Sequence, residues 1–481
     1  MPFRGGIRPS FSAAGTALAT SDERRDLQRA IWAIALPSML TNVATALFGL
    51  ADIWVIGQLG QAEPQAGVEL GAKFMMGLLV VFNFLRTGTI ALTAQAAGRG
   101  DEEAQAATLA RALGVSLAIG LALLALKPLI VPWGMELLQA RGGVAREAGI
   151  YVGIRYWGGL LWLANVALMG WLIGRRRVRA VLWTEIGSNL VHIALDLLFV
   201  LGFGWGVAGV AAATLLSEGG KTLALLGVTA RQGPARAALA AAGRRATWSA
   251  ASMGALFRLN RDLFLRTLLL TAAILLLTRQ GAQQGPLVLA ANGILYQLFI
   301  LSALVLDGFE SAAQVLCGEA VGAKDRRRFD ALVRALLLRG LAGGALFSLL
   351  YLAAGARFAA SFSTDPAVVA TTLAYVPWAV LLPILGVSSY VFDGIYIGAT
   401  WTRAMLITMG AACVVYAALL FAAAGLGNHG LWLAFSLFLL ARAAAQAAML
   451  PGLRRRTFAE PDPSPRRGEG QVREANQGEG L

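Results

Sequence analysis

Charged residues are scarce in this chain of 481 residues. Only 14% are Asp, Glu, Lys or Arg, whereas 57% are hydrophobic, and the mean hydropathy is +0.64. A soluble domain carries about 25% charged residues. The composition therefore excludes an ordinary soluble protein and predicts an integral membrane protein.

Cysteine and catalytic motifs are also lacking. Cys317 and Cys413 both lie in apolar segments and give neither a disulfide framework nor a metal-ligand spacing. The sequence has no HExxH motif and no serine elbow in a suitable context. These absences count against a membrane-embedded enzyme, and we expect a protein that is not an enzyme and needs no metal or cofactor.

Long apolar runs are what the chain has in abundance. A helix rises about 1.5 Å per residue, so a run of roughly 20 residues crosses about 30 Å of hydrocarbon. Only helices satisfy their backbone within lipid at this segment length. The sequence predicts twelve transmembrane helices, near 31–57, 70–97, 106–131, 151–174, 180–201, 207–229, 259–283, 287–316, 331–354, 371–400, 403–425 and 429–452.

The second half of the chain repeats the first, 224 residues further on. The matching positions include Gly98 and Gly322, Asp101 and Asp325, Gly170 and Gly394, Gly174 and Gly398, and Arg179 and Arg403. Two copies of one unit in an apolar chain are typical of a transporter with its site between the halves. Each half has six helices, so both halves have the same orientation. We expect a pseudo-twofold axis along the membrane normal and a central cavity.

Positive charge predicts the orientation. The net charge is +14, and alternate connections between the predicted helices hold fifteen Lys and Arg residues against five in the others. This bias places both termini in the cytoplasm, and we expect a multi-pass protein of a bacterial inner membrane. It also explains the basic runs without a nucleic-acid partner, and we expect a monomer.

The same pattern divides the chain into five parts. The first residues lack a continuous apolar core and are not a cleavable signal peptide. The end of the chain is rich in Gly, Pro, Glu and Arg, a composition typical of disorder. We predict a disordered tail over 1–29, a first lobe over 30–230, a cytoplasmic linker over 231–258, a second lobe over 259–452 and a disordered tail over 453–481.

Polar residues in the first half gather at one depth. Asp52, with Thr41 and Thr45, falls on one face of its helix, and His192 and Asp196, with Asn189, fall on one face of another. Thr214 lies at a similar depth, and Asn165 sits near the middle of its helix. Two desolvated carboxylates in one layer disfavour each other's ionised form, which suits proton coupling. Alternatively, each Asp bonds a neighbouring helix, and His192 is either a proton relay or a core histidine.

The second half has its own polar stripe of Asp307, Glu310, Gln314 and Asp393. Carboxylates that face a cavity attract cationic substrates. The alternative pairs these acids with Arg86, Arg339 or Arg266. Arg86 occupies the position equivalent to Glu310, 224 residues earlier.

Short spacings and prolines give further expectations. We expect structural ion pairs between Asp262 and Arg266 and between Glu218 and Lys221. Pro37 interrupts the first helix and favours a moving bend there. For Pro377 and Pro383 a static kink is the expectation.

These residues resemble the multidrug and toxic compound extrusion (MATE) transporters, in the branch named for DNA-damage-inducible protein F. The resemblance runs from about residue 25 to 452. The matching runs include Leu50-Ala-Asp-Ile-Trp-Val-Ile-Gly57, Leu195-Asp-Leu-Leu-Phe-Val200, Trp205-Gly-Val-Ala-Gly209 and Asp393-Gly-Ile-Tyr-Ile-Gly-Ala-Thr400.

The resemblance implies two six-helix lobes around a V-shaped cavity and the export of organic, often cationic, compounds in exchange for protons or sodium. It places a coupling cluster on Asp52, Asn165, His192, Asp196 and Thr214. Relatives usually carry Asn where this chain has His192. The sodium pattern of other branches does not match here, which favours protons.

The sequence therefore predicts a proton-coupled antiporter for cationic amphipathic compounds. The coupling residues would be Asp52, Asp196, Asn165, Asn189, His192 and Thr214, and the substrate-binding residues Asp52, Arg86, Asp307, Glu310, Gln314 and Asp393. A sodium-coupled antiporter, a flippase for lipid-linked precursors and a channel are the alternatives.

Overall fold

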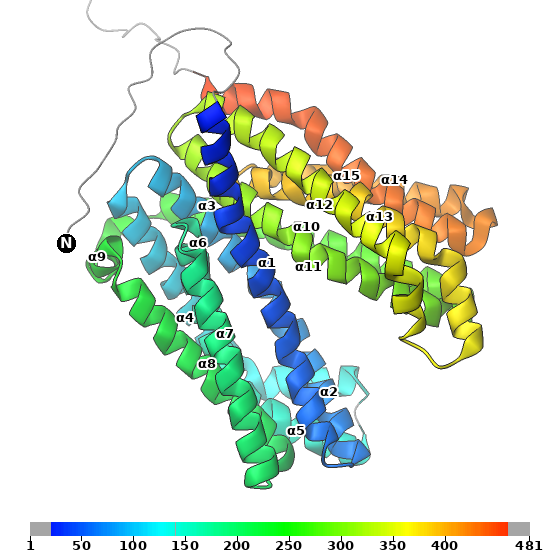
Figure 1. Ribbon diagram of the computed structural model, residues 1–481. Coiled ribbons are helices and arrows are strands. Elements are labelled where there is room, and N and C mark those ends of the chain that lie inside the picture. The colour runs from blue at the N-terminus through cyan, green and yellow to red at the C-terminus, as the bar shows by residue number, and fades with distance from the viewer. Residues whose placement is uncertain (1–20, 140, 460–481) are drawn as a thin grey trace, which may run out of the picture.

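The computed structural model describes residues 21–139 and 141–459, and within them the chain forms helices and no strand (Figure 1). The predicted tails lie mostly outside this range, in residues 1–20 and 460–481. The first half contains α1 (Ser21–Gly57), α2 (Ala62–Val80), α3 (Phe84–Gly98), α4 (Glu102–Leu137), α5 (Gly142–Arg155), α6 (Gly158–Gly174), α7 (Val178–Asp196), α8 (Gly206–Ala230) and α9 (Gly233–Ala242). The second contains α10 (Ala250–Gln283), α11 (Pro286–Gly322), α12 (Arg326–Ala360), α13 (Pro366–Gly398), α14 (Thr402–Ala422) and α15 (Gly427–Phe458).

Each of the twelve predicted segments falls in one of these helices or in a consecutive pair. Segment 151–174 is divided between α5 and α6, which meet at a bend of 52°. By length and composition, eight described helices could cross a membrane, or nine if this bent pair is one span. Helices α1, α8 and α10, which carry buried polar side chains, are not among them.

Some predicted boundaries shift in the structure. Residues 21–29, predicted to belong to a disordered tail, form the first turns of α1. The linker predicted over 231–258 contains α9 and the start of α10, and α15 continues to Phe458 rather than ending at 452. Acidic residues explain the first change, because Asp22 and Glu23 stand in the first turn, where negative charge stabilises a helix.

The repeat appears as reciprocal contacts between α3 and α11. A methyl group at Gly98 would meet the carbonyl of Glu319, and one at Gly322 would meet the carbonyl of Gln95. Both glycines and both contacted residues are related by the same offset of 224. Each half therefore presents the same close approach to the other, as a pseudo-twofold axis requires.

Two further equivalent residues, Asp101 and Asp325, each cap the N-terminus of a helix. Asp101 caps α4 by accepting from the Ala104 amide at 2.8 Å, and Asp325 caps α12 by accepting from the Arg328 amide at 2.9 Å. These caps satisfy amides that the first turn leaves without a partner.

Helix α1 connects the two lobes (Figure 1). Its first half packs on α11: Ala35 and Met39 contact Gly308, and the Asn42 side chain donates to the Leu304 carbonyl at 3.0 Å. Its last turns belong to the first lobe, where Val55 and Ile56 are buried with residues of α2 and α5. A change in the conformation of α1 would therefore alter its packing against both lobes.

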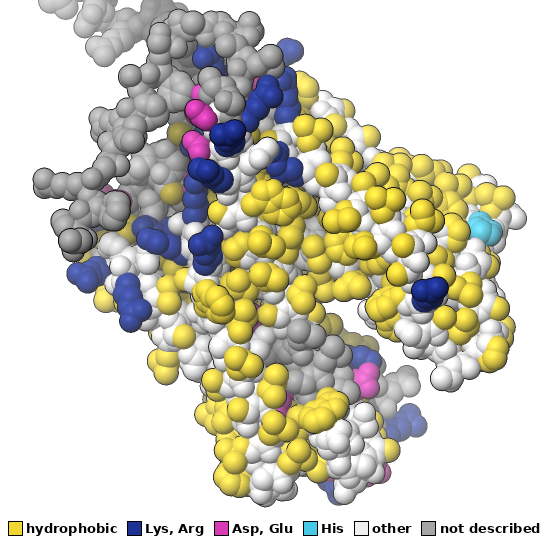
Figure 2. Space-filling model, in the orientation of Figure 1, with side chains coloured by type: hydrophobic (Ala, Val, Ile, Leu, Met, Phe, Trp, Pro, Cys, Tyr) yellow, Lys and Arg dark blue, Asp and Glu magenta, His cyan; other side chains and the backbone are white. Residues whose placement is uncertain are grey.

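The lobes meet at the end of the bundle where the described chain begins and ends, which we call the closed end. There Gln95 donates to the Gly398 carbonyl at 2.8 Å, and Arg176 pairs with Glu319. At the opposite end the lobes diverge, and Figure 2 shows the surface hollowed between them. Lys and Arg side chains gather toward the closed end, and hydrophobic side chains cover much of the remaining visible face.

Candidate functional site

Three polar side chains meet inside the first lobe. The Nε2 nitrogen of His192 lies 2.6 Å from Asp52 Oδ1 and 3.0 Å from Asp196 Oδ2. His192 and Asp196 are 0% exposed and Asp52 is 4% exposed. We call these residues the carboxylate–histidine cluster. It joins the last turns of α1 to the last turns of α7, toward the open end of the molecule.

Local structure holds the cluster in place. His192 and Asp196 are four residues apart, so they share one face of α7. Directly after Asp196 the chain forms a π turn over Leu197–Gly202, a feature often found at functional sites. On the far side of the imidazole, Ser217 Oγ lies 3.4 Å from His192 Nδ1. The ring is therefore fixed by α1, α7 and α8.

The cluster has more acceptors than donors. One Nε2 hydrogen cannot serve both carboxylates fully, since Asp52 Oδ1 and Asp196 Oδ2 both lie within 3.0 Å of the same nitrogen. A proton shared among the two acids and the imidazole would satisfy the remaining acceptor. One nitrogen of His192 and one carboxylate oxygen from each acid all lie within 4.8 Å of one another, so these three residues could also act as ligands to a metal ion.

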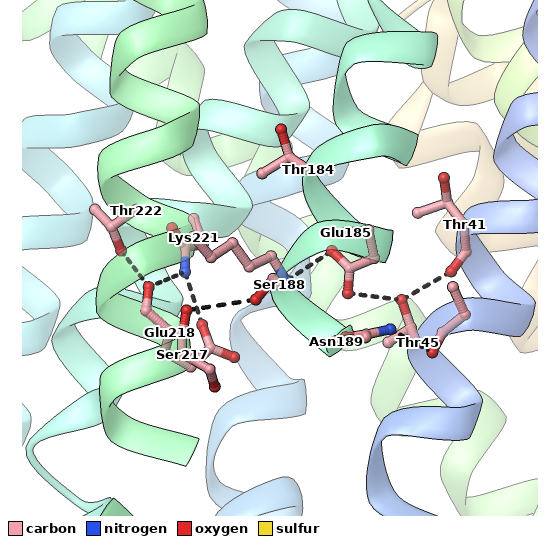
Figure 3. A network of polar contacts seen from close by, with 12 residues as sticks. Thr41, Thr45, Thr184, Glu185, Ser188, Asn189, Ser217, Glu218, Lys221 and Thr222 are labelled. Carbon is pink, nitrogen blue, oxygen red and sulfur yellow. Dashed lines mark hydrogen bonds and ion pairs between the residues drawn. The ribbon is translucent and has the colours of Figure 1, made fainter. Parts of the chain in front are cut away.

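A second polar network lies nearer the beginning of α7, toward the closed end of the molecule (Figure 3). Lys221 Nζ lies 2.7 Å from Glu185 Oε2, and the Thr45 hydroxyl donates to Glu185 Oε1 at 3.2 Å. Asn165 donates to Glu218 Oε2 at 2.7 Å. We call these five residues the lysine network. It connects α1, α6, α7 and α8 through buried charges.

Some predicted coupling residues lie outside the carboxylate–histidine cluster. Asn165 belongs to the lysine network, and Asn189 donates to the Ala44 carbonyl at 2.7 Å. Thr214 is buried near the cluster but its hydroxyl bonds the Val210 carbonyl of its own helix. The structure thus brings Asp52, His192 and Asp196 together and leaves the two asparagines apart.

The lysine network also corrects a predicted ion pair. Lys221 pairs with Glu185 and not with Glu218, because Glu185 faces α8 from the neighbouring helix, whereas Glu218 turns toward Asn165 on α6. Glu185 was not foreseen. Its spacing of four and seven from Asn189 and His192 places all three on one face of α7, and that stripe was the available signal.

Asp393 in the second lobe is not a free carboxylate. It pairs with Arg266 and with Arg442 Nη2 at 2.5 Å, and Gln446 donates to its other oxygen at 2.8 Å. Two guanidinium groups therefore already compensate the charge of Asp393 in this conformation, and its role in substrate binding stays a prediction. The alternative pairing with Arg266 is the one observed.

This arrangement also corrects the pairing expected for Asp262. Arg266 is taken by Asp393, and Asp262 instead pairs with the adjacent Arg261 at 2.8 Å. Arg442 was not foreseen, although it lies well inside the predicted segment 429–452, and an arginine within an apolar span was the available signal.

Asp307 and Glu310 lie half-buried on α11. Glu310 accepts a hydrogen bond from Gln314 at 2.8 Å. Arg86, on α3, is also half-buried, and its strongest electrostatic partners are Glu310, Glu185 and Asp307. Four of the predicted substrate-binding residues, Arg86, Asp307, Glu310 and Gln314, thus lie where α3 and α11 pack together.

Comparison with known proteins agrees with this architecture. The MatE family model matches residues 37–198 and 263–422, one stretch in each half. The DNA damage-inducible protein F of Escherichia coli (strain K12) is 32% identical over 444 residues, which cover 92% of this chain and 96% of that protein. A probable multidrug resistance protein NorM of Deinococcus radiodurans is 30% identical and covers 84% of this chain and 90% of that protein.

Solved structures show the same fold. A crystal structure of MATE in the bent conformation superposes with a TM-score of 0.82 at 18% identity, covering 90% of this chain and 97% of that one. An outward-facing multidrug resistance MATE transporter gives a TM-score of 0.76 at 19% identity, covering 90% and 96%. The predicted all-α membrane fold is confirmed, and the chain belongs to the MatE family of membrane transporters.

Proposed function

We propose that this protein is a secondary antiporter that exports cationic amphipathic organic compounds in exchange for protons. It would work as a monomer in a bacterial inner membrane with both termini in the cytoplasm. The lobes then meet on the cytoplasmic side, and the conformation described here is outward-facing. A relative named as a probable multidrug resistance protein supports the export of organic compounds.

The carboxylate–histidine cluster is the observation that carries the proposal. It is buried, it contains two acids and one imidazole, and it sits between α1 and α7. A hard cation such as sodium prefers a shell of oxygen ligands. Here an imidazole nitrogen lies within 3.0 Å of an oxygen of each carboxylate. This arrangement favours a proton over sodium.

The proton would act through α1. When Asp52 is neutralised, its attraction to His192 weakens and the outer half of α1 is free to repack around Pro37. Because the inner half of α1 packs on α11, the movement reaches the second lobe. Substrate leaves to the outside, the lobes rock, and the proton is released on the cytoplasmic side.

One proton supplies enough energy for useful export. An elementary charge that crosses 100 mV yields about 2.3 kcal/mol. Since about 1.4 kcal/mol corresponds to a factor of ten, this drives roughly fiftyfold accumulation.

Proteoliposomes test the proposal. With a pH gradient imposed, we expect wild-type protein to exchange a cationic dye for protons and Asp52→Asn to lose this exchange. Asp26→Asn, at an exposed position, is the matched control. Undiminished proton-driven exchange by Asp52→Asn would refute coupling at Asp52. Exchange driven by a sodium gradient alone would favour the sodium-coupled alternative, and conductance without exchange would indicate a channel.

A flippase for lipid-linked precursors is less well supported. Anionic headgroups call for a cationic cavity, whereas Arg86 is flanked by Glu310, Glu185 and Asp307. An excess of carboxylates around a single arginine suits cationic substrates better.

A further inference from the structure

Arg86 and Glu310 stand at equivalent positions of the two halves and carry opposite charges. They are 224 residues apart, on α3 and α11. Their backbones are held in equivalent ways: a methyl group at Gly170 would meet the Arg86 carbonyl, and one at Gly394 would meet the Glu310 carbonyl. The pseudo-twofold axis therefore relates a cation in the first lobe to an anion in the second.

Arg86 lacks a fixed partner in this conformation. It forms no ion pair within 4.0 Å and no hydrogen bond with the residues that the structure describes. Its Nε nitrogen is buried without an acceptor. Its electrostatic partners come from both lobes, Glu310 and Asp307 from α11 and Glu185 from α7. Arg86 is thus a guanidinium held among three carboxylates and bound to none.

The other buried cations near these acids already form ion pairs. Arg266 and Arg442 are bound to Asp393, and Lys221 is bound to Glu185. Gln314 is the side chain that bonds Glu310, and no hydrogen bond or ion pair links Asp307 to another described residue. Arg86 is therefore the cation that remains to compensate Asp307 and Glu310.

Asp307 and Glu310 are two carboxylates that share this one remaining cation. Uncompensated charge in a membrane interior is costly. A monovalent organic cation at these carboxylates would compensate the charge that a single arginine leaves over.

We propose that Arg86 is a tethered cation that occupies the place of the substrate at Asp307 and Glu310, and that a monovalent organic cation displaces it. This inference rests on the proposed function and names the group that sets its charge specificity. Once Arg86 is displaced, its attraction to the two carboxylates of α11 is lost. Since this attraction acts between the lobes, its loss favours their separation.

Binding of ethidium, a monovalent organic cation, to purified protein tests the competition. Arg86→Gln removes the competing charge, so the Kd should fall about tenfold. Arg86→Lys keeps the charge, and its Kd should stay within about threefold of wild type. Arg339→Gln is the matched control, because Arg339 is also half-buried and donates to the Ala335 carbonyl of its own helix. Its Kd should not change.

Exchange of the two charges gives a second test. Glu310→Arg alone should weaken ethidium binding by more than about tenfold, since it adds a cation at the site. The double variant Arg86→Glu with Glu310→Arg restores the charge balance with the two groups swapped across the axis. Its Kd should return to within about threefold of wild type, a coupling that independent sites would not give.

The outcomes separate the two proposals. If wild-type protein binds no organic cation, the proposed substrate class is wrong. If wild type binds ethidium but Arg86→Gln binds it equally or more weakly, Arg86 is a structural or direct binding residue and the competition is refuted. If the charge exchange fails to rescue binding while both single variants remain folded, the link between these two positions is refuted.

Discussion

The Nε2 nitrogen of His192 lies between two acids, 2.6 Å from Asp52 and 3.0 Å from Asp196. The other ring nitrogen, Nδ1, lies 3.4 Å from the Ser217 hydroxyl on α8, so the imidazole is the point at which α1, α7 and α8 meet. A change in the protonation of this ring would alter the contact that holds the outer half of α1.

Substitution of His192 should therefore change how transport depends on pH. His192→Gln keeps an amide donor near Asp52 but cannot gain a proton. We expect dye efflux by this variant to be at least about tenfold slower and to vary much less between about pH 5 and 8 than efflux by wild type. Initial rates in proteoliposomes at a series of pH values, with the membrane potential held constant, provide the measurement.

The chain offers a matched control for this test. His429, the other histidine, lies on α15, where it accepts a hydrogen bond from Trp378 at 3.1 Å and faces the surface. His429→Gln should keep the wild-type pH profile. An unchanged profile in His192→Gln would show that the imidazole has no part in coupling.

Much of this architecture could be predicted from the sequence, because hydrophobic runs locate the helices and the internal repeat relates the two halves. The offset of 224 predicted which glycines would be equivalent, and Gly98 and Gly322 make reciprocal contacts. Depth along each predicted helix also predicted that Asp52 and Asp196 would lie in one layer. Both arguments use only position along the helix axis.

The ion-pair partner of each buried charged side chain could not be predicted, because it depends on how each helix is rotated about its own axis. Lys221 had acids at Glu218 on its own helix and at Glu185 on a neighbour, and only the packing of α7 on α8 selects Glu185. Likewise Asp393 is neutralised by Arg442, which lies on a helix that the sequence does not place beside it.

The lysine network leads to a prediction about stability. Lys221→Met leaves the Glu185 and Glu218 carboxylates buried without their nearest cation. Since the paired side chains of Lys221 and Glu185 are only 12% and 3% exposed, we expect a loss of about 3–5 kcal/mol in the free energy of unfolding. The double variant Lys221→Met with Glu185→Gln should recover part of that loss, because one buried charge is then removed. Denaturant unfolding in detergent measures both.

An exposed pair of the same type serves as the control. Lys73 and Glu69 lie 2.8 Å apart on α2 with side chains 66% and 50% exposed. Lys73→Met should cost about 0–1 kcal/mol, as surface pairs do. Equal losses in the free energy of unfolding for Lys73→Met and Lys221→Met would mean that the buried ion pair stabilises the protein no more than an exposed one.

Pro37 gives a prediction about movement. Proline has no N–H to bond the carbonyl of Ala33, which weakens α1 at this point. Pro37→Ala restores that bond and should stiffen the helix. We expect dye binding close to wild type but efflux several-fold slower, since the outer half of α1 repacks less readily. Pro132→Ala, at an exposed position within α4, should leave efflux unchanged, and an equal effect of both substitutions would argue against a hinge at Pro37.

Glu319 closes the molecule at the end where the lobes meet. It pairs with Arg176 of the first lobe and lies 3.6 Å from Arg328 of its own lobe. Its repeat partner, Gln95, carries an uncharged amide at the equivalent position. Glu319→Gln therefore makes the second copy resemble the first and removes the ionic contact between the lobes.

This substitution should shift the balance between conformations. A partly exposed ion pair contributes about 1 kcal/mol or less, so the population open at this end should rise up to about fivefold. Spin labels at Arg231→Cys and Arg403→Cys, in a background lacking Cys317 and Cys413, would report a longer distance in a larger fraction of molecules. Glu103→Gln breaks the pair with Arg244, which links α4 to the segment after α9, and should leave the distances unchanged. A Glu319→Gln distribution that matches wild type would show that backbone contacts at Gly98 and Gly322 suffice to hold the lobes together.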